Sequence, residues 1–570
     1  MKMKQNYKAT TLLAWVLLCP LGHAANADNL LTNISLLLSA NNHPYFFKPY
    51  TEQEQLTLRE LYQLNQNQLL WFNNTHSEHA IKQLLELFSN ASTQGLNSTD
   101  YASNYLKIQW QKQQSNPDPH QLVTLDTALS LTFLRYLYDL HYGRVLPSQL
   151  NFKLPEKNII KLTSHLYDAI QTGNINPLAK FMEPKLTPYQ QLKKTLAKYR
   201  RLNQHFSQAL HFDFEQSLHP GDSSAQVGEL EYYLDALNTP ENQAIAAKTE
   251  NQNSLYSSDI ADTVRLLQTN HNLLADGIIG KKTQQVLNTP LSKRIKQIEL
   301  AMERLRWLPE QQGAFILVNI PAFQLWAFNG EQKYDQALNM KVVVGKAKHK
   351  NKKREKSLQT PVFSANLSYL VFNPYWNIPQ SILHKEILPL VKHEPDYLQQ
   401  HNMEIVTEFS HHTTALPINE ENISGLYSGQ LRLRQRPGSG NALGHIKFIF
   451  PNEHRVYLHD TSARALFNRN QRDFSHGCIR VENPHKLAQF VLQEQPRWTA
   501  TKIHRAMSAN TPSIVGIKQT IPVLIFYTTA FVTKTGNSFY PDIYDHDSTL
   551  QSALAKRSQL LAITTLATRL

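Results

Sequence analysis

The sequence predicts a multidomain α+β protein in which helical segments come first and a mainly antiparallel β domain follows. Its 570 residues correspond to about three or four domains of roughly 150 residues each. Apolar residues recur with helical spacing as far as about residue 290. From residue 315 onward, short β-branched and aromatic runs alternate with Gly, Pro and Asn. This change of pattern places a domain boundary near residue 291.

The composition indicates a globular chain with an excess of basic residues. Hydrophobic residues make up 41% and charged residues 18% of the sequence, which excludes a disordered chain, a collagen-like polymer and a coiled coil. Lysine and arginine outnumber aspartate and glutamate by 58 to 45, a formal net charge of +13. A charge of this sign favours a polyanionic neighbour, which is nucleic acid, an anionic membrane or an acidic wall polymer.

The N-terminus, residues 1–27, has the pattern of a secretory signal peptide. Lysines precede the apolar run Leu12–Leu21, and a small-residue segment follows it. The run is shorter than the roughly 20 residues of a spanning helix, and no later stretch reaches that length. We therefore expect an exported protein without a transmembrane segment in its mature chain. Removal of the signal takes away Cys19 and leaves Cys478, which is either an inert core residue or a reactive thiol.

Residues 28–214 are predicted to form a helical scaffold domain. The stretch Leu131–Leu140 is apolar around most of its circumference, which indicates a buried helix, and Gly143 and Pro147 mark its end. No motif in this region indicates chemistry.

Residues 215–290 are predicted to form a separate three-helix module. Val227 and Leu230 begin one helical stripe, and a second amphipathic helix follows at about residues 260–267. The segment Asp276–Gly280 is a turn with two glycines before a short third helix. An ordinary helical hairpin is the alternative interpretation.

Residues 291–545 are predicted to form the β domain, and residues 546–570 a C-terminal tail. A polar, helix-prone insertion at about 381–429 interrupts the strand pattern, and such an insertion in a compact domain is typical of a lid over a site. The runs that predict strands are Phe315–Ile320, Phe323–Phe328, Lys341–Val344, Lys447–Phe450, Arg455–Leu458 and Ile521–Val532.

The residues that indicate chemistry are His459 and the segment 475–481, Ser-His-Gly-Cys-Ile-Arg-Val. Thiolate catalysis needs a cysteine with a lowered pKa, an imidazole within hydrogen-bond reach and backbone N–H groups that hold an oxyanion. His459 ends a predicted strand and is expected to face Cys478 across a sheet. Gly477 allows close backbone approach, and the N–H groups of Gly477 and Cys478 are expected to form the oxyanion hole.

This arrangement resembles the L,D-transpeptidase catalytic domain of the YkuD type. The signature of that family is a histidine, a spacer of similar length, [ST]-H-G-C and an arginine shortly afterwards. Flanking segments agree over most of residues 292–545, among them Val344-Gly345, Thr360-Pro361, 372–379 and 441–444.

The helical regions extend the resemblance to the whole chain. The turn at Asp276–Gly280 is similar to the hallmark of the three-helix peptidoglycan-binding module, so the chain resembles the large YcbB-type subgroup of Gram-negative bacteria. The sequence departs from the family at the loop 346–356, which carries seven basic residues. We expect a solvated connection between strands there, with contact to an anionic polymer as the alternative.

The resemblance implies a wall-associated peptidoglycan L,D-transpeptidase of the periplasm, active in cell-wall biogenesis and cell shape. Its donor is a tetrapeptide stem, its product a 3→3 cross-link, and carbapenems are expected to acylate it. Stem peptides and glycan are the expected partners, with other wall synthases as further candidates.

The same resemblance, together with the residues themselves, assigns the site. Cys478 is expected to be the nucleophile that forms a thioester, and His459 its general base. His476, Gly477 and Ser475 are expected to shape the turn and the oxyanion site. Arg480, two residues past the cysteine, is expected to bind a carboxylate of the stem peptide, with bracing through backbone carbonyls or a nearby glutamate as the alternative.

Other functions stay open at this stage. Water as the acceptor would make the same site an L,D-carboxypeptidase, and a lipoprotein amine would make it an anchoring enzyme. An inactive catalytic domain would leave a non-catalytic wall-binding scaffold. His459, His476 and Cys478 are of zinc-ligand type, but the spacing of common zinc sites is absent. We therefore expect no metal or cofactor, and export argues against nucleic acid.

Overall fold

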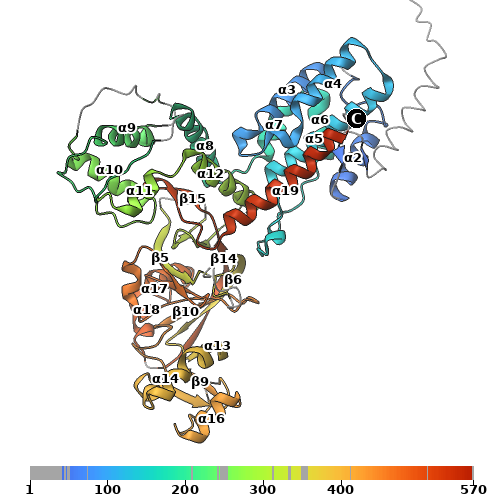
Figure 1. The fold of residues 1–570 in the computed structure, drawn as a ribbon. Coiled ribbons are helices and arrows are strands. Elements are labelled where there is room, and N and C mark those ends of the chain that lie inside the picture. The colour runs from blue at the N-terminus through green and yellow to red at the C-terminus, as the bar shows by residue number, and fades with distance from the viewer. Residues whose placement is uncertain are drawn as a thin grey trace, which may run out of the picture.

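The protein consists of two helical lobes and a β domain (Figure 1). The structure, a computed structural model, describes residues 42–43, 46–47, 52–73, 75–206, 210–240, 243, 245, 254–310, 313–330, 336–347, 357–410, 412–509 and 511–567. The expected signal peptide and residues 348–356 of the basic loop lie outside these ranges. Helical N-terminal regions followed by a β-rich domain agree with the predicted α+β class. In the described part, no helix has both the length and the apolar character needed to cross a membrane.

The first helical lobe surrounds one long buried helix, α5 (Pro119–Tyr142). Asp118 caps its N-terminus by accepting the backbone N–H of His120 at 2.9 Å, and nearly all of its side chains from Val123 to Leu140 are buried. The other elements of the lobe are β1 (Asn42–His43), β2 (Phe46–Phe47), α2 (Glu52–Leu64), α3 (Ser77–Ser89), η1 (Ala91–Gln94), η2 (Ser98–Tyr101), α4 (Ser103–Ser115), η3 (Pro147–Leu150), α6 (Thr163–Thr172) and α7 (Ile175–Met182).

The expected C-terminal tail is instead a long helix, α19 (His546–Ala567). It lies against the first helical lobe, far from the N-terminal helices in sequence (Figure 1). Arg557 of this helix forms an ion pair with Asp139 of α5 at 2.7 Å, and Leu550 is fully buried. A sequence pattern does not show this role, because the partner of Arg557 lies 418 residues away.

The second helical lobe shares its buried core with the β domain. Its helices are α8 (Thr187–His205), α9 (Val227–Asn238), α10 (Ser258–Thr269), α11 (Lys281–Leu287) and α12 (Leu291–Arg306). The three helices expected within residues 215–290 are present, but their core is continuous with that of α8 and of the β domain. Leu230 of α9, Tyr189 of α8 and Trp326 of the β domain belong to one buried cluster.

The β domain contains a nine-stranded sheet in the order β12-β5-β13-β11-β10-β6-β14-β3-β4, and β4 also pairs with β5. Most neighbouring strands are antiparallel, whereas β11–β13, β12–β5 and β14–β3 are parallel. The strands are β3 (Phe315–Asn319), β4 (Gln324–Phe328), β5 (Leu338–Gly345), β6 (Phe363–Phe372), β10 (Ile446–Ile449), β11 (Leu458–His459), β12 (Asp473–Ser475), β13 (Ile479–Val481) and β14 (Ser513–Phe526).

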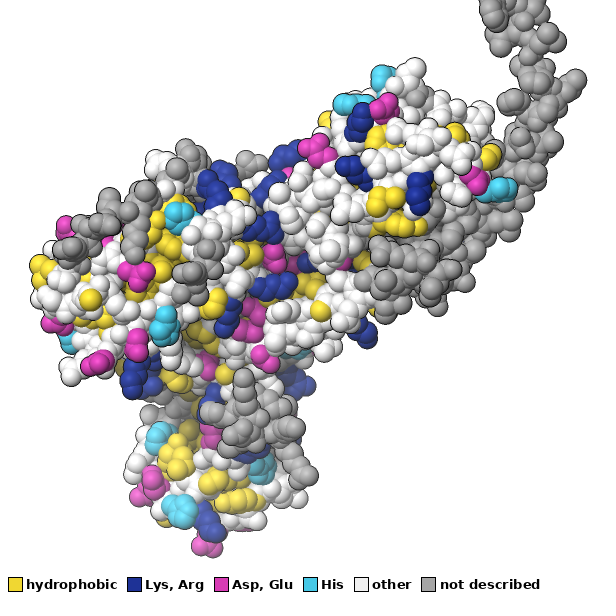
Figure 2. All heavy atoms as spheres, turned by 45° about the horizontal axis from the view of Figure 1, so that its top comes forward, with side chains coloured by type: hydrophobic (Ala, Val, Ile, Leu, Met, Phe, Trp, Pro, Cys, Tyr) yellow, Lys and Arg dark blue, Asp and Glu magenta, His cyan; other side chains and the backbone are white. Residues whose placement is uncertain are grey.

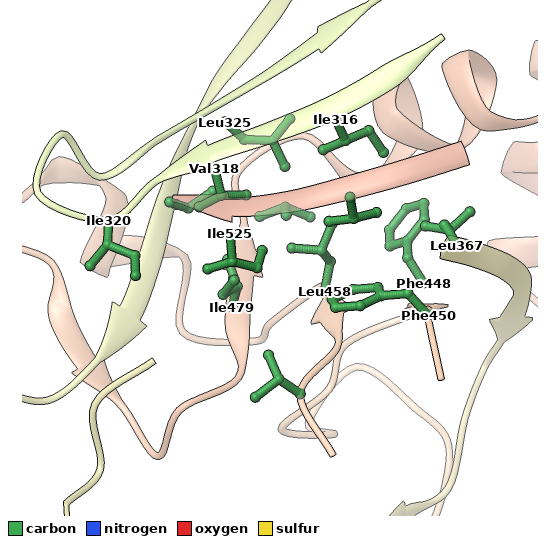
Figure 3. Close-up of a cluster of buried hydrophobic side chains, with 14 of the residues drawn as sticks. Ile316, Val318, Ile320, Leu325, Leu367, Phe448, Phe450, Leu458, Ile479 and Ile525 are labelled. Atoms are coloured by element: carbon green, nitrogen blue, oxygen red, sulfur yellow. The ribbon is translucent and has the colours of Figure 1, made fainter. Parts of the chain in front are cut away.

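Side chains from distant strands meet in the core of this domain. Figure 3 shows them projecting toward one another, and those labelled include Ile316, Val318, Leu325, Leu367, Phe448, Leu458, Ile479 and Ile525. The remaining elements are η5 (Arg464–Asn468), α17 (Pro484–Val491), α18 (Ala500–Met507), β15 (Ala530–Thr533) and β16 (Gly536–Phe539). This packing fixes β11 and β13 side by side, and these two strands carry the candidate site.

The insertion folds as a small unit with its own core at the far end of the β domain (Figure 1). It is wider than the expected range 381–429, because a three-stranded sheet, β7-β9-β8, joins its two ends. Its elements are β7 (Trp376–Asn377), α13 (Gln380–Ile382), η4 (Leu383–Ile387), α14 (Leu388–His393), α15 (Tyr397–Gln400), β8 (Met403–Val406), α16 (Glu420–Ser428) and β9 (Arg432–Gln435).

Charges of both signs are mixed on the face drawn in Figure 2. Lysine and arginine side chains lie among aspartates and glutamates over both helical lobes and where the lobes meet. The positive net charge of the sequence is therefore not gathered into one basic patch on this face.

Candidate active site

Strand register brings the predicted catalytic residues to one face of the sheet. Strands β11 and β13 are parallel, with Leu458 opposite Ile479 and His459 opposite Arg480. Side chains alternate between faces along a strand, so Cys478, directly before β13, lies on the face that carries Arg480 and His459. The structure thus has His459 and Cys478 at adjacent strands, as expected from the sequence.

His459 is held in a defined tautomer. Its side chain is buried, with 4% of its surface exposed, and its Nδ1 donates a hydrogen bond to the Asp460 backbone carbonyl at 2.5 Å. The remaining nitrogen, Nε2, is therefore the one free to accept a proton. Burial, together with the nearby charges of Arg480 and Lys447, lowers the pKa of His459 to about 3. The resting imidazole is neutral at physiological pH.

The side chain of Asp460 makes no hydrogen bond with the imidazole. Its carboxylate accepts the backbone N–H groups of His445 at 2.9 Å and Thr461 at 2.7 Å and a hydrogen bond from Arg464 at 2.6 Å. Gly444, with φ +59°, packs so closely that an added Cβ would lie 2.4 Å from the carboxylate. Asp460 thus braces the end of the strand, and only its backbone carbonyl orients the His459 imidazole.

Cys478 is a partly exposed thiol in a cationic setting. Burial raises the pKa of the thiol, and this effect is opposed by hydrogen bonds from Tyr457 and by the charges of Lys447 and Arg480. Its Sγ contacts the backbone carbonyl of Arg455 at 3.9 Å. The resting pair is therefore a neutral thiol and a neutral imidazole.

The turn before Cys478 is tied by side-chain hydroxyls. The Ser475 Oγ donates to the Cys478 carbonyl at 2.5 Å and accepts the Gly477 N–H at 3.2 Å. Thr360 Oγ1 donates to the Gly477 carbonyl at 2.9 Å, and Gly477 has φ +111°, a region that favours glycine.

These contacts change the expected oxyanion site. Because the Gly477 N–H already binds Ser475, it is not free for an oxyanion in this structure. The Cys478 N–H has no hydrogen-bond acceptor among the described residues, so it is available to donate to an oxyanion beside the thiol.

His476 connects the turn to the insertion. Its Nε2 lies 2.5 Å from the Glu386 carboxylate, and Glu386 belongs to η4 of the insertion. The structure thus places His476 in a contact between the turn and the insertion.

Arg480 carries a guanidinium whose buried Nε is unsatisfied. It has no hydrogen-bond partner among the described residues, and its Nε is buried. The Glu482 carboxylate, its alternative partner, instead accepts the Lys341 backbone N–H at 3.0 Å. Burial lowers the pKa of Arg480. A half-buried cation without a partner costs free energy in the free protein, which favours a role in binding an anion.

Three residues near the cysteine had no assigned role in the sequence analysis: Lys447, Tyr457 and Thr360. Lys447 stands opposite His459 on the third strand, β10, and Tyr457 lies two residues before His459. Period-two spacing gives a signal for Tyr457. Lys447 enters the site through strand order, and Thr360 through a contact with a residue more than one hundred positions away. No local sequence pattern shows either.

Two parts of the chain are similar to known protein families. Residues 313–515 match the family model of the L,D-transpeptidase catalytic domain, and residues 56–196 match that of the scaffold domain. A protein of Haemophilus influenzae named "Putative L,D-transpeptidase" is 31% identical over 313 residues, which cover 54% of this chain and 60% of that protein.

A structural relative is more distant. The crystal structure of the L,D-transpeptidase from Xylanimonas cellulosilytica is 14% identical and covers 55% of this chain and 100% of its own, with a TM-score of 0.17, too low to support an argument. The sequence resemblance is confirmed at the level of domains: residues 313–515 match the YkuD-type L,D-transpeptidase catalytic domain, and residues 56–196 match the scaffold domain that precedes it.

Proposed function

We propose that the protein is a peptidoglycan L,D-transpeptidase that forms 3→3 cross-links through a thioester on Cys478. The observation that supports this most is the placement of Cys478, His459 and the unpartnered Arg480 on one face of adjacent strands. The match of residues 313–515 to the transpeptidase family gives the reaction class.

In the first half-reaction, His459 Nε2 takes the thiol proton while Sγ attacks the carbonyl at the L-centre of the diamino acid. The Cys478 N–H donates to the oxyanion of the tetrahedral intermediate. The C–N bond to the terminal D-Ala then breaks, and the imidazolium returns its proton to the departing amine. The products are free D-Ala and a thioester between Cys478 and the tripeptide.

In the second half-reaction, the side-chain amine of a second stem attacks the thioester carbonyl. His459 Nε2 accepts the proton of that amine, a new amide bond forms, and the thiolate leaves and is reprotonated by the imidazolium. Water in place of the amine would release the tripeptide, which is the carboxypeptidase outcome. A lipoprotein amine would give anchoring by the same steps.

The other parts of the chain support this reaction in our proposal. Arg480 holds a carboxylate of the donor, and the insertion acts as a lid that excludes water through its contact with the nucleophile turn. The helices of residues 215–290 hold the enzyme on the wall. The expected N-terminal signal places the protein in the periplasm.

The test is mass analysis of the products that the purified protein makes from tetrapeptide stems, with Cys478→Ala as the control. We expect 3→3 cross-linked dimers and free D-Ala from the wild type and neither from the variant. If the wild type makes tripeptide alone, the activity is hydrolysis rather than transfer. If it makes no product, the result favours the non-catalytic wall-binding scaffold.

A further inference from the structure

A lysine two strands away faces the nucleophile from the same side of the sheet. Lys447 of β10 stands opposite His459 of β11, and His459 stands opposite Arg480 of β13. Because residues in register share a face, Lys447, His459 and Arg480 form a row across three strands, with Cys478 two residues before the last of them.

The ammonium group of Lys447 is positioned by an aromatic ring. Its Nζ lies 4.4 Å from the centroid of the Tyr457 ring, and Tyr457 is next to the cysteine, since its carbonyl accepts the Ile479 N–H at 3.1 Å. The ammonium group of Lys447 has no carboxylate or carbonyl partner among the described residues. A cation over a ring face keeps its charge available to other groups.

The charge of Lys447 interacts electrostatically with the sulfur of Cys478. A thiolate on Cys478 would favour the charged lysine, and the lysine charge lowers the pKa of the thiol, while burial alone lowers the pKa of Lys447. The groups that act on the sulfur are Tyr457, directly before β11, Lys447 from β10 and Arg480 from β13, with His459 of β11 on the same face, and none of them is a carboxylate.

We propose that Lys447 is a positioning residue that stabilises the Cys478 thiolate by its charge, held in place by the Tyr457 ring. This rests on the proposed function, in which the thiolate is the nucleophile. Because the resting imidazole is neutral and its pKa is low, a fixed cation near the sulfur offsets the cost of moving the thiol proton to a weak base. Arg480, the second cation of the row, is left to bind substrate.

The experiment follows alkylation of Cys478 by iodoacetamide as a function of pH in the full-length protein, with peptide mass analysis to identify the site. Lys447→Met should react about tenfold more slowly near pH 7.5, equivalent to about 1.4 kcal/mol. Its rate should approach that of the wild type at high pH, where both thiols are ionised. Lys447→Arg keeps the charge and should restore the profile.

Lys502→Met is the matched control. The Nζ of Lys502 lies 4.7 Å from the Trp498 ring, so the variant loses a similar ring contact. The charge of Lys502 does not act on Cys478. A structural role alone predicts that both methionine variants lower the melting temperature alike and that neither changes the pH profile.

The possible outcomes separate this inference from the proposed function. A Lys447→Met profile that overlays the wild type, or a Lys447→Arg variant as slow as Lys447→Met, would overturn the role of the charge. If that occurs while the wild type still forms cross-linked dimers, the proposed function stands. A shifted profile in a protein that forms no acylated product would retain the role of Lys447 at the thiol and remove the transpeptidase reaction.

Discussion

Arg480→Lys tests whether the unpartnered guanidinium binds the donor. The substitution keeps the positive charge beside Cys478 but removes the planar group that can grip a carboxylate with two parallel hydrogen bonds. A hydrogen bond to a charged group contributes about 1.5–3 kcal/mol. Loss of one such bond in the transition state should lower kcat/KM for the tetrapeptide about 10- to 150-fold.

Stability should respond differently from activity. The side chain of Arg480 makes no hydrogen bond among the described residues, so its replacement by lysine should change the free energy of unfolding by less than about 0.5 kcal/mol. The rate with a small thiol reagent should also stay near that of the wild type, because the charge near the sulfur is kept.

A second arginine of the same domain serves as the control. Arg472 is buried and donates to the backbone carbonyls of Val342 at 3.2 Å and Phe323 at 3.0 Å. Arg472→Lys should lower the melting temperature and slow every acylating reagent alike. The assays are acylation of the protein by tetrapeptide and by a thiol reagent, with thermal unfolding on the same samples. Normal tetrapeptide acylation in Arg480→Lys would refute the carboxylate-binding role.

Three further predictions concern the base, the insertion and the wall-binding region. His459→Ala should abolish acylation at neutral pH, and acylation should recover partly at alkaline pH, where the thiol ionises unaided. Because the pKa of His459 is about 3, protonation of this group should not slow the wild type between about pH 7 and pH 5. A loss of wild-type activity below about pH 6.5 that is absent from the variant would contradict the neutral resting pair. Glu386→Gln removes the carboxylate that contacts His476 and should raise the ratio of tripeptide to cross-linked dimer in product analysis. An unchanged ratio would remove the lid role from this contact. Gly277→Ala forces a side chain into the turn at φ +77°, 3.1 Å from Arg265, and should lower the fraction of full-length protein that sediments with peptidoglycan sacculi; full sedimentation of a folded variant would count against wall binding through this turn.

The sequence predicted that Cys478 and His459 lie together because its signal is local. Cys478 and Arg480 lie in one short motif, and His459 ends a run of strand-forming residues. Two adjacent strands were enough to place the three on one face. The oxyanion site was less predictable, because the Gly477 N–H is taken by the hydroxyl of Ser475, a hydrogen bond that depends on the exact turn.

Features that depend on contacts between distant residues could not be predicted from the sequence. Lys447 enters the site through strand order, and Thr360 through a hydrogen bond to a residue 117 positions away. The C-terminal residues looked like a tail, since the carboxylate that pairs with Arg557 belongs to the first lobe. The expected boundaries of residues 215–290 do not mark a separate core, because Leu230 shares one cluster with Trp326 of the β domain.

The most direct test of the thioester mechanism is the intact mass of the protein after brief exposure to a tetrapeptide donor without an acceptor. We expect the wild type to gain the mass of the donor less its terminal D-Ala, on the peptide that contains Cys478, and Cys478→Ala to gain nothing. The same gain of mass in Cys478→Ala would contradict the assignment of Cys478 as the nucleophile.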